Sequence, residues 1–520
     1  MTKSKFQIFR SKYILYALIA ILIMLIIGVG TSLYAKNKIK DQLQRIDNLT
    51  YKDLNVNFFL GNVELNEINY SWLKEKEDTS RITIRTVDLG GISFWKLLKE
   101  NKLIIDQLSI SGSECQILEL PKFEINDTSR TASKDEFKDI TIKKLKLQNS
   151  SIDYTDSVGW HLTIANADIE LDSISYSNDS LNYKDLVCSI YKINHVTKNG
   201  LHDFSLSKVK ANSLDGSIQL DSLSIFPKHS WASWKNHVPW KKARLHFDAP
   251  KIEIAGVNFD NLIDNPSFVS ELLVVNDAHL RVQVDEDIDV CNSCYKAFVH
   301  EKLLKANLPI NIEKAEVKNS SIYVEAYDKS DQRLIDVEFD NLYASIYNVT
   351  NIDTIIASNP KIIADVQTLF AKQSQLKTQI QFALNDPNYG YVIDAELGAI
   401  DLLDFNKKIQ KGAKISVESG RVNALNFHID GNNELATGTM NLNYEDLKVN
   451  ILNNEKTNRK TIYTGVVNLG VKNGSGEFEE GKIYYERKEG RTIFHQWWGA
   501  IESGFKSVVL RDVLLKKELW

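Results

Sequence analysis

An eight-residue pattern of apolar side chains recurs along the chain, with apolar residues at its first, third, sixth and eighth positions. Each half alternates with period two, which is typical of a β-strand that buries one face. The additional residue in the middle would turn the second half to the opposite face unless the strand bulges or turns there. The pattern therefore predicts a large sheet with one continuous apolar face.

We identify copies of this octad at 63–70, 140–147, 169–176, 218–225 and 337–344. Their unequal spacing argues against a solenoid of equal repeats and favours a meander of strands of variable length. The residues expected to line the apolar face are Val63, Leu65, Ile68, Ile140, Ile142, Leu145, Leu147, Ile169, Leu171, Ile174, Ile218, Leu220, Leu223, Ile225, Val337, Phe339 and Leu342.

Strand-like runs continue between and after the octads, and the sequence predicts a mostly β fold with few short helices. Helical character is expected at 94–100, 261–274 and 294–306, and the polar run 122–138 is expected to be a loop or linker. The predicted architecture is an elongated, curled and mostly antiparallel sheet that forms a groove.

The N-terminal segment from Tyr13 to Ala35 contains no charged residue. As a helix it would be roughly 34 Å long, enough to cross a bilayer core of about 30 Å. A signal peptide is the alternative, but the residues after the apolar run match a cleavage site poorly. Basic residues stand on both sides, so their distribution does not orient the span. We expect an uncleaved anchor, with residues 1–12 cytoplasmic and the body on the far side.

The C-terminal segment 491–520 predicts an amphipathic helix. Its apolar positions recur at helical spacing, and Gln496, Glu502 and Lys506 fill the opposite face. Paired tryptophans suit a membrane interface, whereas a helix that packs on the end of the sheet would show the same pattern. The candidates for contact with a membrane surface are Phe494, Trp497, Trp498, Ile501 and Phe505.

Composition adds limits rather than a function. The net charge of −5 and the lack of a basic stripe interleaved with aromatic residues argue against nucleic-acid binding. The serine-hydrolase elbow, the phosphate-binding loop and the HExxH zinc motif are all missing from the sequence, and no cofactor, metal site or catalytic residue is expected.

Three local features carry alternatives. Cys291 and Cys294 form a lone CxxC, for which a local disulfide or two plain thiols are favoured over a redox pair or half a zinc site. The acidic run 285–289 lacks the glycine and later carboxylate of a calcium loop and is expected to be a solvated turn. The aromatic and basic run 230–247 could touch lipid head groups, but a surface loop with its indoles tucked underneath is favoured.

Both ends of the chain resemble the AsmA family of bacterial envelope proteins. At the C-terminal end, the resemblance rests on the strand pair 431–452 and on 403–431 and 483–509. The matching positions are Asn406, Gly420, Gly431, Gly438, Tyr444, Asp446, Leu447, Glu486, Arg487 and Gly504. At the N-terminal end, an anchor followed by 58–72 and 87–112 resembles the usual opening of that family.

The resemblance implies a taco-shaped β-groove, an inner-membrane anchor with a periplasmic body, and a role in moving phospholipid toward the outer membrane. The expected organisation is a tail (1–12), a membrane span (13–35), a β-groove region (36–300), an AsmA-like β region (301–490) and the C-terminal helix (491–520). The expected partners are the membrane, phospholipid or another acyl-chain lipid, and an envelope protein at the C-terminal end. The rival hypothesis is a non-enzymatic scaffold for outer-membrane protein assembly, which would bind partners by strand addition.

Overall fold

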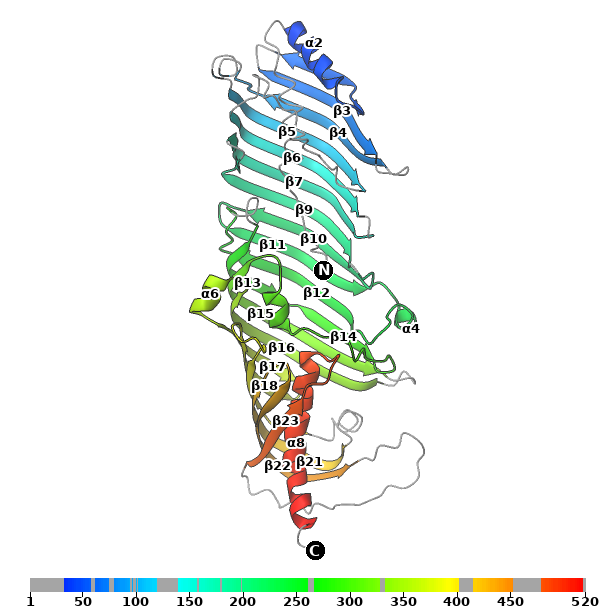
Figure 1. Ribbon diagram of the computed structural model, residues 1–520, viewed down its shortest axis with the longest axis vertical. Helices are drawn as coiled ribbons and strands as arrows, with labels where there is room; N and C mark the ends of the chain where they lie inside the picture. Colours follow the sequence, from blue (N-terminus) through cyan, green and yellow to red (C-terminus); the bar gives the residue numbers. More distant parts are fainter. Residues whose placement is uncertain are drawn as a thin grey trace. The chain divides into compact units, whose positions relative to one another are not determined.

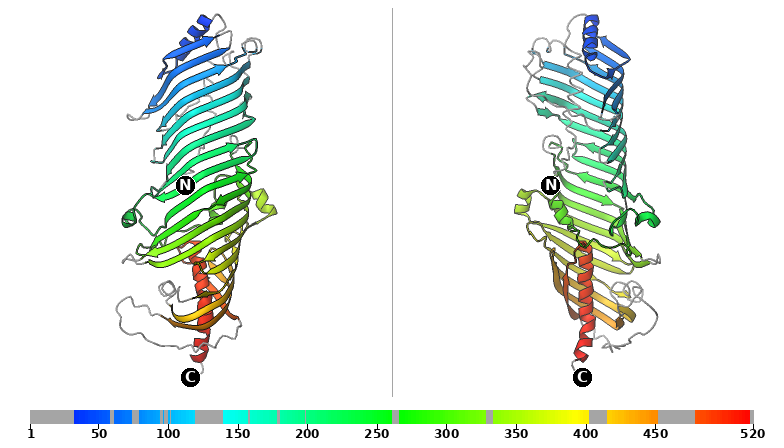
Figure 2. Two further views of the ribbon diagram at one scale, coloured as in Figure 1. Left: turned by 180° about the vertical axis from the view of Figure 1, so that it is seen from behind. Right: turned by 45° about the vertical axis from the view of Figure 1, so that its right-hand side comes forward.

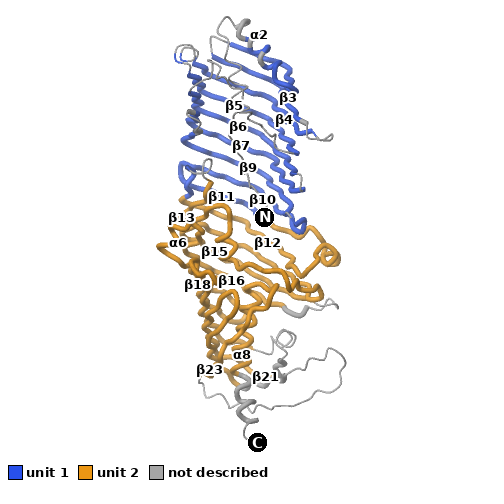
Figure 3. The backbone as a smooth tube through the Cα atoms, in the orientation of Figure 1, with its two compact units in different colours: residues 1–223, 257–265 blue, residues 224–256, 266–520 orange. Residues whose placement is uncertain are grey.

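The computed structural model describes residues 32–57, 61–73, 79–93, 96, 100, 102–118, 139–156, 159–177, 180–197, 199–260, 266–327, 333–401, 415–451 and 478–517. The chain divides into two compact units (Figure 3): unit 1 comprises 1–223 and 257–265, and unit 2 comprises 224–256 and 266–520. The expected boundary at 300/301 therefore falls inside unit 2. The expected cytoplasmic tail, most of the expected span and the expected loop at 122–138 lie outside the described residues. No helix within the described ranges is long and apolar enough to cross a membrane.

In its described residues, unit 1 is a sheet with helix α2 near its N-terminal end (Figure 1). Its elements are α2 (Ser32–Leu43), β1 (Leu49–Thr50), β2 (Asp53–Asn57), β3 (Asn62–Leu73), β4 (Thr79–Gly90), β5 (Lys102–Ile117), β6 (Asp139–Thr155), β7 (His161–Ser177), β8 (Ser180–Asn182), β9 (Asp185–Val196), β10 (His202–Asn212) and β11 (Ser217–Pro227), the last of which ends in unit 2. The strands pair in the order β2, β3, β4, β5, β6, β7, β9, β10.

Unit 2 is a second run of paired strands with a long C-terminal helix (Figure 2). Its elements are α4 (Trp231–Trp234), β12 (Arg244–Ala255), β13 (Phe268–Asn276), β14 (His279–Asp285), α5 (Val299–Leu304), β15 (Ile310–Tyr327), β16 (Arg333–Thr350), α6 (Asp353–Ser358), β17 (Lys361–Phe370), β18 (Ser374–Ala383), β19 (Tyr391–Leu397), β20 (Ile400–Asp401), β21 (Ile415–Gly431), β22 (Leu435–Ile451), β23 (Glu479–Glu486) and α8 (Ile493–Lys517). β12 pairs with both β13 and β14, which pair with β15, and the order continues through β16, β17, β18, β19, β21, β22 and β23.

The mostly β fold with few short helices is confirmed, but the sheet is mixed rather than antiparallel throughout. β5 pairs with β6 in parallel, and β13 and β14 both pair with β15 in parallel. Long connections precede β6 and β15, and such a connection lets the next strand enter in the same direction, which a tight hairpin cannot do. The expected helix at 261–274 is also wrong from Phe268 onward, because Phe268–Asn276 is a strand. Its Leu-Leu-Val-Val run is compatible with a buried strand as well as with a buried helix.

The irregularity expected within the octads is confirmed. In four of the five octads the fifth residue has a left-handed backbone: Glu67 (φ 49°), Ser173 (φ 53°), Ser222 (φ 54°) and Asn341 (φ 47°). The remaining octad faces such a kink, since its Lys144 pairs with Asp172 beside Ser173. Each kink costs about 1–2 kcal/mol. It keeps two further apolar side chains on the buried face, and each of these contributes about 1.5–3 kcal/mol. The apolar face therefore outweighs the backbone strain.

The C-terminal helix α8 is confirmed, and it packs directly on the sheet. A Cβ on Gly481 of β23 would lie 2.8 Å from the Gly504 carbonyl oxygen, and one on Gly504 would lie 2.8 Å from Ile483. Glycines at this contact let the helix approach the backbone of β23 closely.

Candidate functional site

The octads of unit 1 align across the sheet into continuous apolar rows. One row crosses eight strands, from β2 to β10, and every member is apolar. It runs Leu54, Leu65, Val87, Ile110, Leu147, Ile169, Cys188 and Ala211. Neighbouring strands are about 4.8 Å apart, so the row spans roughly 34 Å.

A second row lies beside the first on the same face, two residues away along each strand. It runs Val56, Val63, Leu89, Leu108, Leu145, Leu171 and Leu186. The two rows together form what we call the apolar track of unit 1. Six of its members are among the residues that the octads assigned to the apolar face: Val63, Leu65, Leu145, Leu147, Ile169 and Leu171.

Other members of the track were missed, although their signal is in the sequence. Two further octads read Ile82, Ile84, Val87, Leu89 and Leu103, Ile105, Leu108, Ile110. They lie on β4 and β5 and have the same spacing as the other octads. The contributions of Cys188 and Leu186 follow only from the pairing of β9 with β7.

The apolar track is covered unevenly. Leu54, Leu65, Val87 and Ile110 are buried in a cluster that also includes Ile39 and Leu43 of α2. Leu147, Ile169 and Cys188, farther along the same row, are only half-buried. Each Å² of apolar surface left in contact with water costs about 25 cal/mol relative to burial. A further apolar surface that covered this face would recover that free energy.

The expected lining residues do not all lie in this track. Val63, Leu65, Ile68, Ile140, Ile142 and Ile174 belong to the core cluster of unit 1, and Leu145, Leu147 and Leu171 pack against it. Ile218, Leu220, Leu223 and Ile225 are half-buried on β11. Val337, Phe339 and Leu342 lie on β16 in unit 2.

In unit 2 the chain itself covers much of the apolar face. Phe298, Ile356, Ile429 and Met440 share a core cluster with residues of α8, including Ala500. Protein side chains therefore fill this part of the apolar face of unit 2.

Helix α8 divides the expected membrane-interface residues into two groups. Phe494 and Trp498 are 61% and 44% exposed, whereas Trp497, Ile501 and Phe505 pack against the core of unit 2. Gln496, expected on the polar face, is only 1% exposed and donates a hydrogen bond to the Asn432 carbonyl at 3.0 Å. The buried side of α8 therefore differs from the expected apolar side. Small residues such as Ala500 lie at the contact with the sheet.

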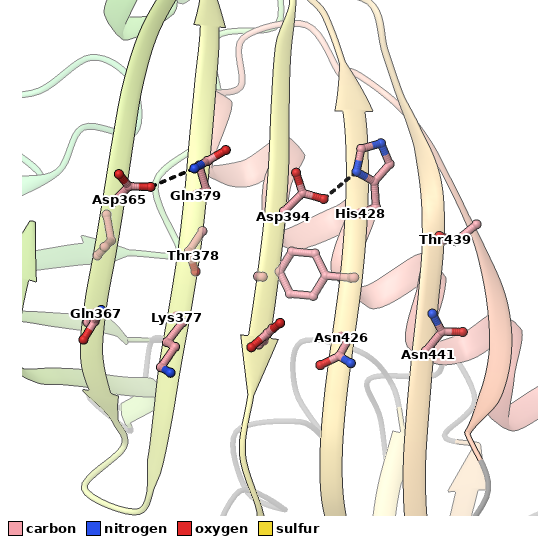
Figure 4. A pocket seen from close by; sticks show the side chains of 14 residues that line it. Asp365, Gln367, Lys377, Thr378, Gln379, Asp394, Asn426, His428, Thr439 and Asn441 are labelled. Carbon is pink, nitrogen blue, oxygen red and sulfur yellow. Dashed lines mark hydrogen bonds and ion pairs between the residues drawn. The ribbon is translucent and has the colours of Figure 1, made fainter. Parts of the chain in front are cut away.

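The opposite, polar face of unit 2 carries a hollow of about 670 Å³ (Figure 4). Two rows of side chains that cross the strands line it. One row is Asp365, Gln379, Asp394, His428 and Thr439, and the other is Gln367, Lys377, Glu396, Asn426 and Asn441. Asp365 accepts a hydrogen bond from Gln379 (2.9 Å), and Asp394 pairs with His428 (2.6 Å). The lining of this hollow includes no serine or cysteine, and the cross-strand neighbour of His428 is Thr439.

Cysteine and acidic groups show no reactive arrangement within the described ranges. Cys291 and Cys294 form a disulfide, with their Cα atoms 5.2 Å apart. Burial raises the pKa of Cys115 to about 11, so this cysteine is a neutral thiol rather than a nucleophilic thiolate at pH 7. The acidic run 285–289 is a turn after β14, and no described group of His, Cys, Asp and Glu has the arrangement of a metal site.

No protein-family model matches this chain, and neither does any curated protein.

Proposed function

We propose that this protein binds acyl-chain lipid along the apolar track of unit 1, as a membrane-anchored envelope protein that conducts phospholipid and supports the outer membrane. The observation that carries the proposal is the track itself: two adjacent rows of apolar side chains that cross seven or eight strands and are half-buried where they cross β6, β7 and β9. Apolar walls of this kind solvate acyl chains without any catalytic group.

Several features agree with this proposal. The track runs across the strands, so a lipid chain lying on it would contact successive strands in the same way. The AsmA-like ends of the chain and the apolar segment Tyr13–Ala35 suggest an inner-membrane anchor and a periplasmic body. Phe494 and Trp498 give α8 an exposed aromatic pair suited to a membrane interface.

The experiment is site-specific photo-crosslinking in the full chain reconstituted with alkyne-tagged phospholipid. A photoreactive residue at Ile169 lies on the track, and one at Ser175 lies on the opposite face of the same strand. We expect lipid adducts at Ile169 and few or none at Ser175. Equal labelling at the two positions would show that lipid contacts the protein without preference and would remove the basis of the proposal.

A charged residue placed on the track tests whether lipid transfer depends on the track. Ile169→Glu should reduce the transfer of fluorescent phospholipid between vesicles at least several-fold, because an ionised carboxylate is costly to cover with hydrocarbon. Ser175→Glu adds the same charge to the other face and should leave transfer unchanged. Full transfer activity in Ile169→Glu would contradict conduction along the track.

The rival scaffold hypothesis depends on open strand edges, and one edge is blocked. β23 pairs with β22 alone among the described strands. The Lys482 and Tyr484 amides of β23 donate to Ser507 Oγ (2.9 Å) and Ser503 Oγ (3.1 Å) of α8. With these donors occupied, β23 is a poor template for an added strand. Among the described strands, β1 and β2 each pair with β3 alone, and they form the edge of unit 1 that strand addition would use.

A further inference from the structure

A cluster of charged side chains lies on the polar face of unit 2, outside everything described so far. It comprises Arg244 and His246 of β12, Arg281 and Gln283 of β14, and Glu325 of β15, and we call it the arginine cluster. Register places Arg244 beside Gln283 and Gln283 beside Glu325, while His246 stands beside Arg281. Alternate residues on these strands, such as Leu245 and Val282, face the other way.

The carboxylate of this cluster, that of Glu325, accepts hydrogen bonds from three side chains. Glu325 is 0% exposed and accepts hydrogen bonds from Arg281 Nε (2.7 Å), Gln283 Nε2 (3.0 Å) and Tyr327 OH (2.8 Å). These donors, together with the charge of Arg281, keep the pKa of Glu325 below its usual value despite burial, which acts in the opposite direction. Glu325 therefore balances Arg281 and has little left for a second cation.

Arg244 has no carboxylate partner among the described residues. Its Nε donates to the His229 carbonyl (3.2 Å), and its Nη1 donates to Gln283 Oε1 (2.5 Å) and to His246 Nε2 (2.9 Å). A guanidinium has five N–H groups, so the two on Nη2 are left over. Burial and the neighbouring Arg281 both lower the pKa of Arg244.

The remaining groups near the cluster do not supply the missing charge. His246 accepts through Nε2, so it is neutral, and burial followed by the two arginines lowers its pKa. Lys241 is paired with Glu286 at 2.9 Å. Asp248 is two residues beyond His246 on β12 and raises the pKa of His246 only as a lesser influence.

A short segment before β12 borders the cluster. The Trp231 ring lies 4.8 Å from the Tyr327 ring, and the Phe226 ring lies 6.3 Å from His246. This segment also supplies the His229 carbonyl that holds Arg244. The hydrogen bonds of Arg244 hold its half-buried guanidinium in place. Of the aromatic and basic run 230–247, Trp231 borders the cluster, Trp234 is buried and Trp240 is exposed.

We propose that Arg244 and Arg281 bind the phosphate group of a ligand on this face. An uncompensated, partly buried cation is costly, and an anion recovers that cost. Diagonal neighbours on a sheet face lie within reach of each other through long side chains, so both guanidiniums can contact one tetrahedral oxyanion. Arginine forks suit phosphate geometry, and charge-assisted hydrogen bonds are the strong ones. A carboxylate, with two oxygens, would be saturated by a single fork.

The inference is independent of acyl-chain binding, because the cluster lies in unit 2 on the polar face and the apolar track lies in unit 1. The phosphate could belong to a lipid head group or to a soluble phosphate ester, and the chemistry at Arg244 is the same for both.

The test titrates the full chain with inorganic phosphate, with chloride of equal ionic strength as the reference, and follows binding by calorimetry. Arg244→Gln should weaken phosphate binding at least 10-fold, and Arg244→Lys should weaken it less, since a lysine keeps the charge but loses the fork. Lys251→Gln removes the same charge from an exposed position of the same strand and should have no effect. Unaltered binding in Arg244→Gln, or an equal loss in Lys251→Gln, would overturn the proposal.

A second measurement does not depend on the folding of any variant. Phenylglyoxal modifies accessible guanidiniums, and mass spectrometry then reports the extent of modification at Arg244 in the unmodified sequence. We expect inorganic phosphate to protect Arg244 whichever the source. Further protection by glycerol phosphate would indicate a soluble ester. Further protection by phosphatidylglycerol vesicles, and not by oleate vesicles, would indicate a lipid head group. Absence of protection by every phosphate-containing probe would refute the site.

Discussion

Replacing Ser173 by glycine should stabilise unit 1, although glycine normally weakens a strand. Ser173 is exposed and has φ 53° at the kink of the third octad. A left-handed conformation costs a residue with a Cβ about 1–2 kcal/mol. Glycine avoids that cost but loses about 0.5–1 kcal/mol more conformational free energy on folding. The balance predicts a gain of roughly 0.5–1 kcal/mol.

The same change two residues away should have the opposite sign. Ser175 lies on β7, pairs with Thr141 of β6, and is not among the left-handed residues. Ser175→Gly should therefore cost roughly 0.5–1 kcal/mol, so the two variants should differ by about 1–2 kcal/mol. Ser173→Val should be the least stable substitution at the kink, because a β-branched side chain is strongly disfavoured at positive φ.

Urea unfolding of the full chain, followed by circular dichroism, measures the change in stability. Amide hydrogen exchange along β6 and β7 assigns that change to unit 1, since a chain of two units need not unfold in one step. Equal destabilisation by Ser173→Gly and Ser175→Gly would refute the reasoning. It would mean that the octad kink carries no backbone strain and that the apolar face is kept continuous by some other means.

The remaining predictions concern α8. Ser503→Ala combined with Ser507→Ala should leave two β23 amides without partners and promote concentration-dependent self-association, which light scattering would detect; a molar mass equal to that of the unaltered protein would show that the serine hydroxyls are dispensable. Gly504→Val should loosen α8 and expose β23 to faster hydrogen exchange, because even a Cβ would meet Ile483 at 2.8 Å; unaltered exchange would contradict this contact. Burial, with Arg491 and Lys488, lowers the pKa of His495 to about 4. His495 takes up a proton near pH 6.5 in the unfolded chain and only near pH 4 in the folded chain, so acidification between these values should destabilise the protein. His495→Gln should flatten this pH dependence of the unfolding free energy.

The sequence was most informative where structure depends on near neighbours. The octad spacing predicted strands, a single apolar face and an irregularity at a defined position, and the left-handed residues Glu67, Ser173, Ser222 and Asn341 confirm that position. Side-chain alternation follows from the backbone geometry of a strand, so it is visible in any short window of residues.

The expectations failed where several local patterns fit the same residues. Phe268–Asn276 carries apolar residues that suit a helix or a buried strand, and only pairing with β12 and β15 selects the strand. On α8, polarity placed Gln496 toward solvent, but Gln496 is 1% exposed and lies on the side where Ala500 and Gly504 pack on the sheet. The helical period was correct, while the buried side depended on shape rather than polarity.

The sequence by itself determined which residues alternate and that an apolar face exists. Only the tertiary structure decided which strands stand side by side, and hence that Leu65, Val87, Ile110, Leu147 and Ile169 form one row. It also brought together the charges of the arginine cluster, whose central ion pair joins residues 44 positions apart. The physical reason is that alternation is set by the backbone of each strand, whereas register, cover and charge balance depend on partners that no local window contains.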